Sequence, residues 1–402
     1  MDYEFQSNSQ RMSDNTSPEK PLLELLERFR ALYGEPAIVV QAPGRINLIG
    51  EHTDYNEGFV LPAAIEFQTQ IAVARRGDRR LRVTSENYGE TVEFDLDDMP
   101  ASARGHWSDY IAGVVGQLDR ILSNLPGANA LINGNVPQGA GLSSSASLEV
   151  AVCQAMLEIS GNKFDGARVA ELCQRAENEF VGARCGIMDQ FVSVHGKRNH
   201  ALMLDCRTLE CQQLPIPSGL RLVICNTMVR HSVAAGAYNK RRAECETGAR
   251  YFAERVPGTR TLRDVTRADF ERFDGELPEV IRRRCRHVLS ENSRVLQAAD
   301  ALRSGDVDML GRLMERSHAS LRDDFEVSCE ELDLMVRLAR ENPGVCGARM
   351  TGGGFGGCTI NLVQEAHVED FRAKVAKGYE RTTGRLPEIY ISSAADGAGR
   401  LA

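Results

Sequence analysis

The amino-acid sequence predicts a mixed fold of helices and strands, and two recurring patterns carry this prediction. Short apolar segments predict strands at 37–41, 69–74, 81–85, 91–94, 130–134, 220–226, 347–350, 359–363 and 387–391. Longer segments with helical spacing of apolar residues predict helices at 107–123, 144–159, 167–180, 235–255, 277–303, 306–320 and 330–340. A length of 402 residues is ample for two or three compact units, and no Pro/Gly/Ser-rich linker separates the halves.

Charge, cysteine content and hydropathy narrow the class of protein. The formal net charge is −8, which argues against broad nucleic-acid binding. The 11 cysteines include no C-x-x-C pair, which favours free thiols in a cytoplasmic compartment over a zinc site or disulfides. No apolar segment is long enough to span a bilayer, and no secretory signal is recognisable. The polar residues 1–20 predict a disordered tail, in which Met12 is an alternative start.

The segment 44–65, GRINLIGEHTDYNEGFVLPAAI, concentrates polar groups between apolar residues and glycines. Glu51 and Asp54 only accept hydrogen bonds, Arg45 only donates them, and His52 can do either. Glycines allow the chain to leave a strand and turn, so these groups are expected on a loop held between buried strands. This combination of hydrogen-bond donors and acceptors suits a ligand rich in hydroxyl groups, such as a sugar. An exposed cluster of ion pairs, which would contribute little to stability, is the alternative.

The segment 136–151, VPQGAGLSSSASLEVA, is a Gly-Ser loop followed by a helix that should begin near 143–145. The free N–H groups and the positive dipole end of such a helix favour an anion. No lysine follows the last glycine, which excludes a Walker A loop, and Ser144 occupies the third glycine position of G-x-G-x-x-G. An ordinary serine cap without a ligand is the alternative reading.

A third segment, TGGGFGGCTI at 351–360, places five glycines between apolar residues. Such a loop lets the backbone approach a ligand closely, or it makes a tight turn between two strands. Taken alone, the segment favours the turn.

Together the three segments resemble the motifs of the GHMP kinases, and the first resembles the galactokinases among them. The segments 173–193 (CQRAENEFVGARCGIMDQFVS) and 226–246 (NTMVRHSVAAGAYNKRRAECE) resemble galactokinase segments that carry a catalytic aspartate and a substrate-binding tyrosine. The resemblance runs from about Leu22 onward. It implies an α+β fold with a ribosomal S5 domain 2-like domain at 21–210, a ferredoxin-like domain at 211–402 and an active site in the cleft between them.

The same resemblance implies ATP-dependent phosphorylation of α-D-galactose at the C1 hydroxyl, the first step of galactose catabolism, and assigns the site residues. Asp189 would accept or orient the hydroxyl proton, and Arg45 would keep Asp189 ionised and bind substrate. The implied galactose ligands are Arg45, Glu51, His52, Asp54, Gly186, Asp189 and Tyr238. The implied ATP ligands are Trp107, Gly139, Gly141, Ser143, Ser144 and Ser145, and the implied Mg²⁺ ligands are Ser145 and Glu177. Core packing is the alternative role for Trp107.

Three other functions remain open at this point. One is a GHMP kinase for N-acetylgalactosamine or arabinose, and another is a galactose- and ATP-sensing regulator on the same fold with little turnover. The presence of Asp189, Arg45 and Ser145 favours catalysis over sensing. A mevalonate or homoserine kinase lacks support, because those relatives do not share the GEHTDYN motif at 50–56. We expect no nucleic-acid or membrane partner, and a monomer rather than an oligomer.

Overall fold

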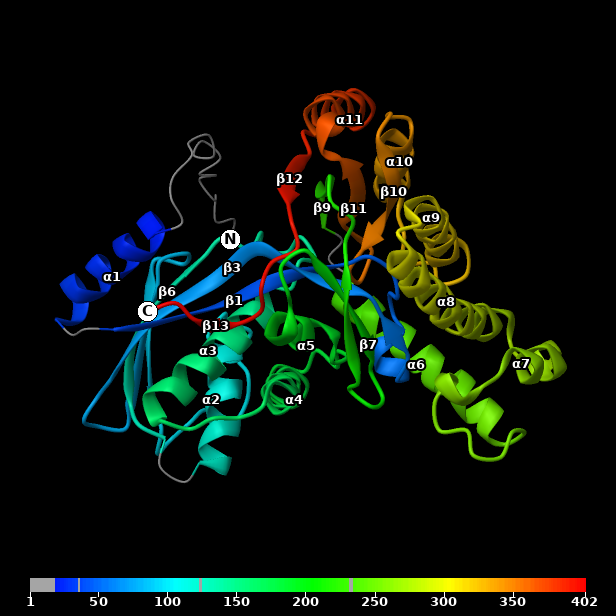
Figure 1. Cartoon of the computed structure of the whole chain (residues 1–402). Coiled ribbons are helices and arrows are strands. Elements are labelled where there is room, and N and C mark those ends of the chain that lie inside the picture. Colours follow the sequence, from blue (N-terminus) through cyan, green and yellow to red (C-terminus); the bar gives the residue numbers. More distant parts are fainter. Residues whose placement is uncertain (1–18, 35–36, 123–124, 231–233) are drawn as a thin grey trace.

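The N-terminal half of the molecule is built on a six-stranded sheet. The computed structural model describes residues 19–34, 37–122, 125–230 and 234–402 (Figure 1). The strand order is β13-β1-β3-β6-β4-β5, and only β4 and β6 are parallel neighbours. The strands are β1 (Ile38–Asn47), β3 (Pro62–Arg75), β4 (Arg80–Ser85), β5 (Glu90–Asp95), β6 (Ala128–Gly134) and β13 (Gly399–Arg400).

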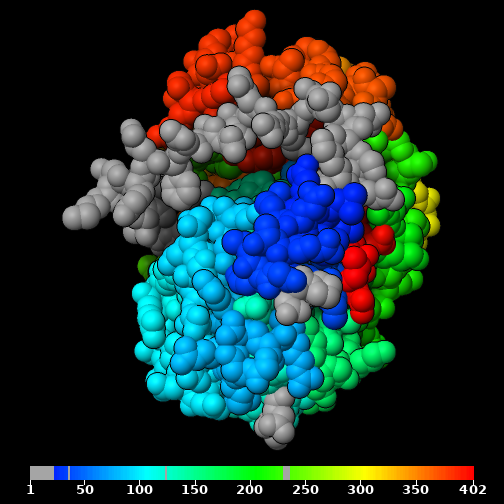
Figure 2. All heavy atoms as spheres, turned by 90° about the vertical axis from the view of Figure 1, so that its left-hand side faces the viewer, coloured from blue at the N-terminus to red at the C-terminus, as the bar shows by residue number. Residues whose placement is uncertain are grey.

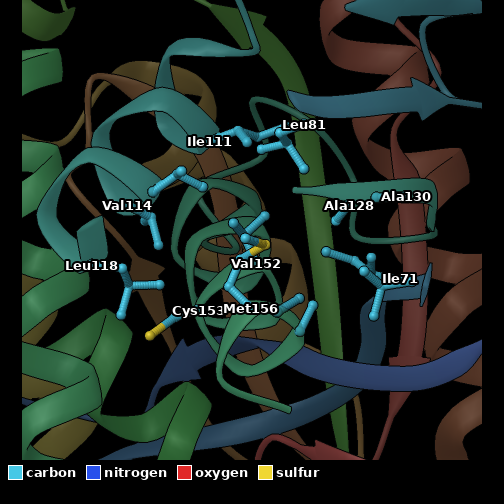
Figure 3. Packing of buried hydrophobic residues seen from close by; sticks show 14 of the residues in the cluster. Ile71, Leu81, Ile111, Val114, Leu118, Ala128, Ala130, Val152, Cys153 and Met156 are labelled. Carbon is cyan, nitrogen blue, oxygen red and sulfur yellow. The ribbon is translucent and has the colours of Figure 1, made fainter. Parts of the chain in front are cut away.

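Helices cover both faces of this sheet because its central strands carry apolar side chains on alternate faces. Val40 and Ile71 pack with residues of α2 and α3 in one core cluster (Figure 3). Val39 and Ala72 pack against α1 in a second cluster. The helical elements are α1 (Glu19–Tyr33), α2 (Asp109–Ile121), α3 (Ser144–Ser160), α4 (Gly166–Ala176), the π-helical turn η2 (Glu177–Val181) and α5 (Met188–His195).

A second, antiparallel sheet in the order β10-β11-β9-β12 organises the C-terminal half. One face, with Val223 and Val363, packs against α10 and α11. The other face, with Ile224 and Leu362, packs against α9 and against residues of β1, so one core cluster joins the two halves. The elements are β9 (Leu220–Arg230), β10 (Val345–Thr351), β11 (Gly356–Gln364), β12 (Glu388–Ser392), α8 (Glu279–Ser304), α9 (Val307–Asp323), α10 (Glu330–Arg340) and α11 (Val368–Thr383).

Shorter elements connect these layers. β2 (Phe59–Val60), β7 (His200–Asp205) and β8 (Cys211–Pro215) form a three-stranded sheet in the order β2-β7-β8. The remaining helical elements are α6 (Ala234–Ala253), α7 (Arg267–Phe273) and the 3₁₀ turns η1 (Asp54–Asn56), η3 (Leu262–Asp264), η4 (Asp274–Glu276) and η5 (Glu365–His367).

The C-terminal strand β13 lies at one edge of the first sheet. β13 pairs with β1 through Val40 opposite Arg400, and Ile65 of β3 forms a bridge with Ala394. In Figure 2 the red C-terminal residues accordingly lie beside the blue N-terminal segment. Strand pairing therefore attaches 399–400, and also β8, to the N-terminal half, whereas the domain bounds at 210 and 211 stay a prediction.

The strands and helices predicted from the sequence are all present. α10 has the predicted bounds, most other ends are shifted, and residue 123 of the helix predicted over 107–123 lies outside the described residues. The helix predicted over 167–180 differs, because α4 ends at Ala176 and a π-helical turn replaces its last part. Of the tail predicted over 1–20, residues 1–18 with Met12 lie outside the described residues, and α1 begins at Glu19. All eleven cysteines are free thiols. Across the described ranges, no helix combines the length and the apolar character needed to cross a membrane.

Candidate active site

The Gly-Ser loop ends at the N-terminus of α3, which begins at Ser144 as the sequence predicts. Ser143 precedes the helix in a left-handed conformation with φ 59°, and its side chain makes no capping hydrogen bond. The Ser143 hydroxyl donates instead to the Asp189 carboxylate. The reading of this residue as an ordinary serine cap is therefore wrong. The N–H groups of the first helical turn keep no side-chain cap, which suits an incoming anion.

A cavity of about 280 Å³ opens beside this helix end. Its wall includes Trp107, whose ring stacks on Tyr88 with centroids 5.0 Å apart and planes 8° apart. The Trp107 indole N–H donates to Glu90 at 2.8 Å. Trp107 also packs against the core cluster, so its packing role is confirmed, and its place beside the adenine stays a prediction. Gly139, Ser144 and Ser145 line the same cavity.

Arg45 and Asp189 face one another, as the resemblance implies. The Arg45 Nε lies 2.7 Å from Asp189 Oδ1, and its Nη2 lies 2.7 Å from Oδ2. The third nitrogen, Nη1, donates to the carbonyl of Gly141 at 2.6 Å. Arg45 is only 6% exposed. A partly buried, bidentate pair of this kind fixes both side chains and links the segment 44–65 directly to the Gly-Ser loop.

A second cavity, of about 480 Å³, begins at this pair. Glu51 and His52 in its wall are 3% and 4% exposed, so the alternative of an exposed ion-pair cluster is wrong. All seven side chains or backbones expected to bind the sugar line this cavity: Arg45, Glu51, His52, Asp54, Gly186, Asp189 and Tyr238. Tyr110 lines both cavities, which places them next to each other.

The third glycine-rich segment closes one side of the sugar cavity. It is the turn between β10 and β11, as predicted, and Gly352 and Gly353 also line the cavity. The Gly352 N–H donates to Glu51 Oε1 at 2.8 Å, and the buried Arg349 lies 3.3 Å from the same oxygen. Gly352 has φ 83°, and an added Cβ would lie 3.0 Å from the Gly141 carbonyl oxygen. The reading as a turn between two strands is therefore confirmed, and the close approach to a ligand stays a prediction.

His52 is held by the protein on both ring nitrogens. Its Nδ1 lies 2.9 Å from the Tyr55 hydroxyl, and its Nε2 lies 3.3 Å from the carbonyl oxygen of Gly353. Burial, assisted by nearby positive charge, lowers the pKa of His52 to about 3. The imidazole is therefore neutral near pH 7.

Asp54 and Gly186 are fitted closely to each other. Asp54 Oδ1 accepts a hydrogen bond from the Tyr55 N–H at 2.9 Å. A Cβ added at Gly186 would lie 2.0 Å from Asp54 Oδ2, so only glycine fits there while this carboxylate keeps its place. Burial, and after it the charge of Asp189, raises the pKa of Asp54 to about 7.

Glu177 lies on the π-helical turn, next to the Gly-Ser loop. Its Oε2 accepts from Gln190 Nε2 at 2.6 Å, and the Ser145 hydroxyl also bonds to its carboxylate. Burial, followed by the charge of Asp189, raises the pKa of Glu177. No group of three or more His, Cys, Asp or Glu side chains gathers for a metal among the described residues. A pair of oxygens from Ser145 and Glu177 still fits Mg²⁺, which keeps waters and binds substrate phosphates.

Sequence reasoning missed several groups around these cavities. Gln190 Nε2 bridges Glu177 and the fully buried Glu149, the latter at 3.0 Å. Arg349 lies on β10 and contacts Glu51 from the C-terminal half. The one available signal for Arg349 was its position as the only charged residue in the strand predicted over 347–350. For Gln190 the only sequence signal was its position next to Asp189.

Taken together, the fold, the glycine-rich loops and the Arg45–Asp189 pair define a GHMP kinase. The description "GHMP kinases N terminal domain" matches residues 109–197, and "GHMP kinases C terminal" matches residues 298–381. A mevalonate kinase of Methanococcus jannaschii shares the fold with a TM-score of 0.62 at 16% identity, over 90% of this chain and all of that one.

More specific matches follow from the first motif. "Galactokinase galactose-binding signature" matches residues 27–75. A galactokinase of Roseiflexus sp. (strain RS-1) is 47% identical over 94% of this chain and 97% of that relative. The crystal structure of Lactococcus lactis galactokinase complexed with galactose gives a TM-score of 0.91 at 35% identity, over 95% of this chain and all of that one. The chain belongs to the galactokinase family of GHMP kinases.

Proposed function

We propose that this kinase transfers the γ-phosphoryl group of ATP to the C1 hydroxyl of α-D-galactose, giving galactose 1-phosphate and ADP. One observation carries the proposal. The Arg45–Asp189 pair borders the sugar cavity and is bonded to the Gly-Ser loop through both Gly141 and Ser143. A hydroxyl bound in that cavity and a phosphate bound on that loop would meet at this pair.

The residues of the site have two roles in phosphoryl transfer: some position the sugar, and others accept the proton or stabilise negative charge. Asp189 accepts the proton of the attacking hydroxyl, and Arg45 stabilises the negative charge of the transferred group. The buried Glu51 and the partly buried Asp54 accept hydrogen bonds from particular sugar hydroxyls, with His52, Tyr238 and the Gly186 backbone completing the wall. An epimer would leave a buried acceptor unpaired, which is a source of specificity.

The nucleotide would bind along the other cavity. The first turn of α3 and the loop residues Gly139, Gly141, Ser143, Ser144 and Ser145 hold the phosphates, and Trp107 lies beside the base. Ser145 and Glu177 would hold Mg²⁺, which when bound neutralises phosphate charge. Free thiols at all eleven cysteines support a reducing, cytoplasmic setting, and we propose a monomer there.

ADP release with ATP and Mg²⁺ across a panel of sugars tests this function. We expect turnover with galactose that exceeds turnover with N-acetylgalactosamine, arabinose or glucose, and loss of turnover when EDTA removes the metal. Preference for another sugar would replace galactose as the substrate. Galactose binding without turnover of any sugar would favour the sensing regulator instead.

The affinity for galactose should depend on pH through Asp54. Its pKa is about 7 in the free protein, so the carboxyl is protonated below pH 7 and ionised above it. Sugar hydroxyls that donate to the carboxylate favour its ionised form, so galactose binding should release a proton. We expect the galactose Kd to be about tenfold higher at pH 6 than at pH 8, by titration calorimetry.

Asp54→Asn is the matched variant for this pH dependence, because the amide keeps the shape and cannot ionise. Its galactose Kd should be nearly constant between pH 6 and pH 8. His52, with a pKa of about 3, stays neutral over this range and contributes nothing to the slope. An equal slope in the wild-type protein and in Asp54→Asn would assign the titration to another group.

A further inference from the structure

A third cavity lies apart from the two described above. Its volume is about 820 Å³, which is larger than either of them, and it shares no lining residue with them. It opens between α7, α8, α9 and β2, in the region where α7 and α8 meet in Figure 1. The catalytic proposal gives this cavity no role.

The lining combines an apolar wall with a cationic rim. Phe59, Leu262 and Phe270 are among the apolar residues. Five arginines and a single acidic residue, Glu271, supply the charge, although the whole chain is acidic at −8. The arginines are Arg263, Arg267, Arg286, Arg294 and Arg316.

Two of these arginines keep donors that the protein leaves unused. Within the described part of the chain, the Arg316 side chain has no ion-pair or hydrogen-bond partner. The Nη2 of Arg294 is buried and likewise lacks a partner there. A buried guanidinium donor without an acceptor is unfavourable, and an anionic ligand would relieve it. The other three arginines pair with acidic side chains: Asp205, Glu271 and Asp324.

Arg294 connects the third cavity to the segment 44–65. Arg294 Nε lies 2.6 Å from Oε2 of Glu291, which is fully buried. The other carboxylate oxygen of Glu291 accepts from the backbone N–H of Gly50 at 3.0 Å. Gly50 directly precedes Glu51 and His52, so one carboxylate separates the third cavity from the loop that shapes the sugar cavity.

We propose that the third cavity is a regulatory site for a small organic anion, a phosphate or carboxylate carried on an apolar or aromatic body. The anion pairs with Arg294 and Arg316 while its apolar part lies against Phe59 and Phe270. By drawing the Arg294 guanidinium away from Glu291, it shifts the Gly50 loop and changes galactose affinity. Coupling of this kind is reciprocal, so galactose changes anion affinity by the same factor.

Binding of phenyl phosphate, measured by titration calorimetry, tests the site. A non-hydrolysable ATP analogue with Mg²⁺ is present throughout to fill the Gly-Ser loop, and inorganic phosphate and phenol are the comparison probes. The variant R267Q/R316Q removes two rim charges whose side chains are exposed. The matched control R272Q/R312Q removes two exposed arginines of the same helices, α7 and α9, that do not line the cavity.

We expect saturable binding of phenyl phosphate that is tighter than that of phosphate or phenol. It should weaken at least tenfold in R267Q/R316Q and stay unchanged in R272Q/R312Q. The absence of saturable binding, or an equal loss in both variants, would overturn the site. These binding measurements do not depend on sugar turnover, so they stand or fall separately from the kinase activity.

The galactose Kd with and without phenyl phosphate tests the coupling. We expect a change of about fivefold or more in the wild-type protein, within the usual range for coupled sites. At a phenyl phosphate concentration that saturates only the wild-type protein, the change should be much smaller in R267Q/R316Q, because the anion binds this variant at least tenfold more weakly. An unchanged galactose Kd at saturating phenyl phosphate in the wild-type protein would overturn the regulatory role.

Discussion

Asp189→Ala should lower kcat for galactose by about a thousandfold or more, because the attacking hydroxyl loses the group that accepts its proton. Arg45 would also lose its bidentate partner, so the transferred phosphate would meet a less ordered cation. Galactose binding should stay measurable, since Glu51, Asp54 and His52 still line the cavity. Steady-state ADP release gives kcat, and titration calorimetry gives the galactose Kd.

Two further variants separate chemistry from structure at this position. Asp189→Asn keeps the side-chain shape and one acceptor for Arg45, and it should lose kcat to a similar degree because an amide is not a base. Asp119→Ala removes an aspartate that pairs with Arg79 away from both cavities, and it should leave kcat unchanged. Turnover close to that of the wild-type protein in Asp189→Asn would end the assignment of Asp189 as the proton acceptor.

Arg349→Met should lower the free energy of unfolding by about 3–5 kcal/mol, the usual cost of leaving a buried charge without its partner. Arg349 is fully buried on β10, where its guanidinium lies 3.3 Å from Glu51 and donates to the Asn47 carbonyl at 3.1 Å. Methionine fills similar space but leaves the buried Glu51 carboxylate without this cation. Urea unfolding followed by circular dichroism measures the change.

Arg340→Met is the matched control, because Arg340 is half exposed and pairs with the exposed Glu315. Its loss should cost less than about 1 kcal/mol. The double variant Arg349→Met/Glu51→Gln should recover part of the lost stability, since it removes the uncompensated charge as well. Equal losses in the free energy of unfolding for Arg349→Met and Arg340→Met would show that the buried pair contributes no more to stability than an exposed one.

The elements that sequence reasoning located are those with long or clean patterns. The helical spacing over 277–303 matches α8, and the Gly-Ser loop ends at a helix within a residue of its expected start. β2, β7, β8, β13, α1, α5, α7 and α11 were not located. The strands among them are short and owe their place to partners distant in the chain, and two-residue elements such as β2 and β13 leave no periodicity to read.

The prediction of the candidate site succeeded and failed for similar reasons. The motifs located the loops, but contacts between distant residues are absent from any local pattern. Arg45 and Asp189 are 144 residues apart and Glu51 and Arg349 are farther still, so only the fold, or a resemblance to a family, brings them together. The rotation of Ser143 away from its helix and toward Asp189 also depends on this tertiary neighbour.

The pairing of β13 with β1 covers a strand edge that stays exposed to aggregation during protein synthesis until β13 has been made. β1 carries Arg45 near one end. Its outer edge pairs with β13, and Val39 also hydrogen-bonds to Leu401 and Ala402. β13 is synthesised long after β1, so this edge of β1 stays open while the chain between the two strands is made. An uncovered strand edge is a template for pairing with another chain. Chains that stop before β13 should therefore aggregate through β1, although every proposed active-site residue precedes that strand.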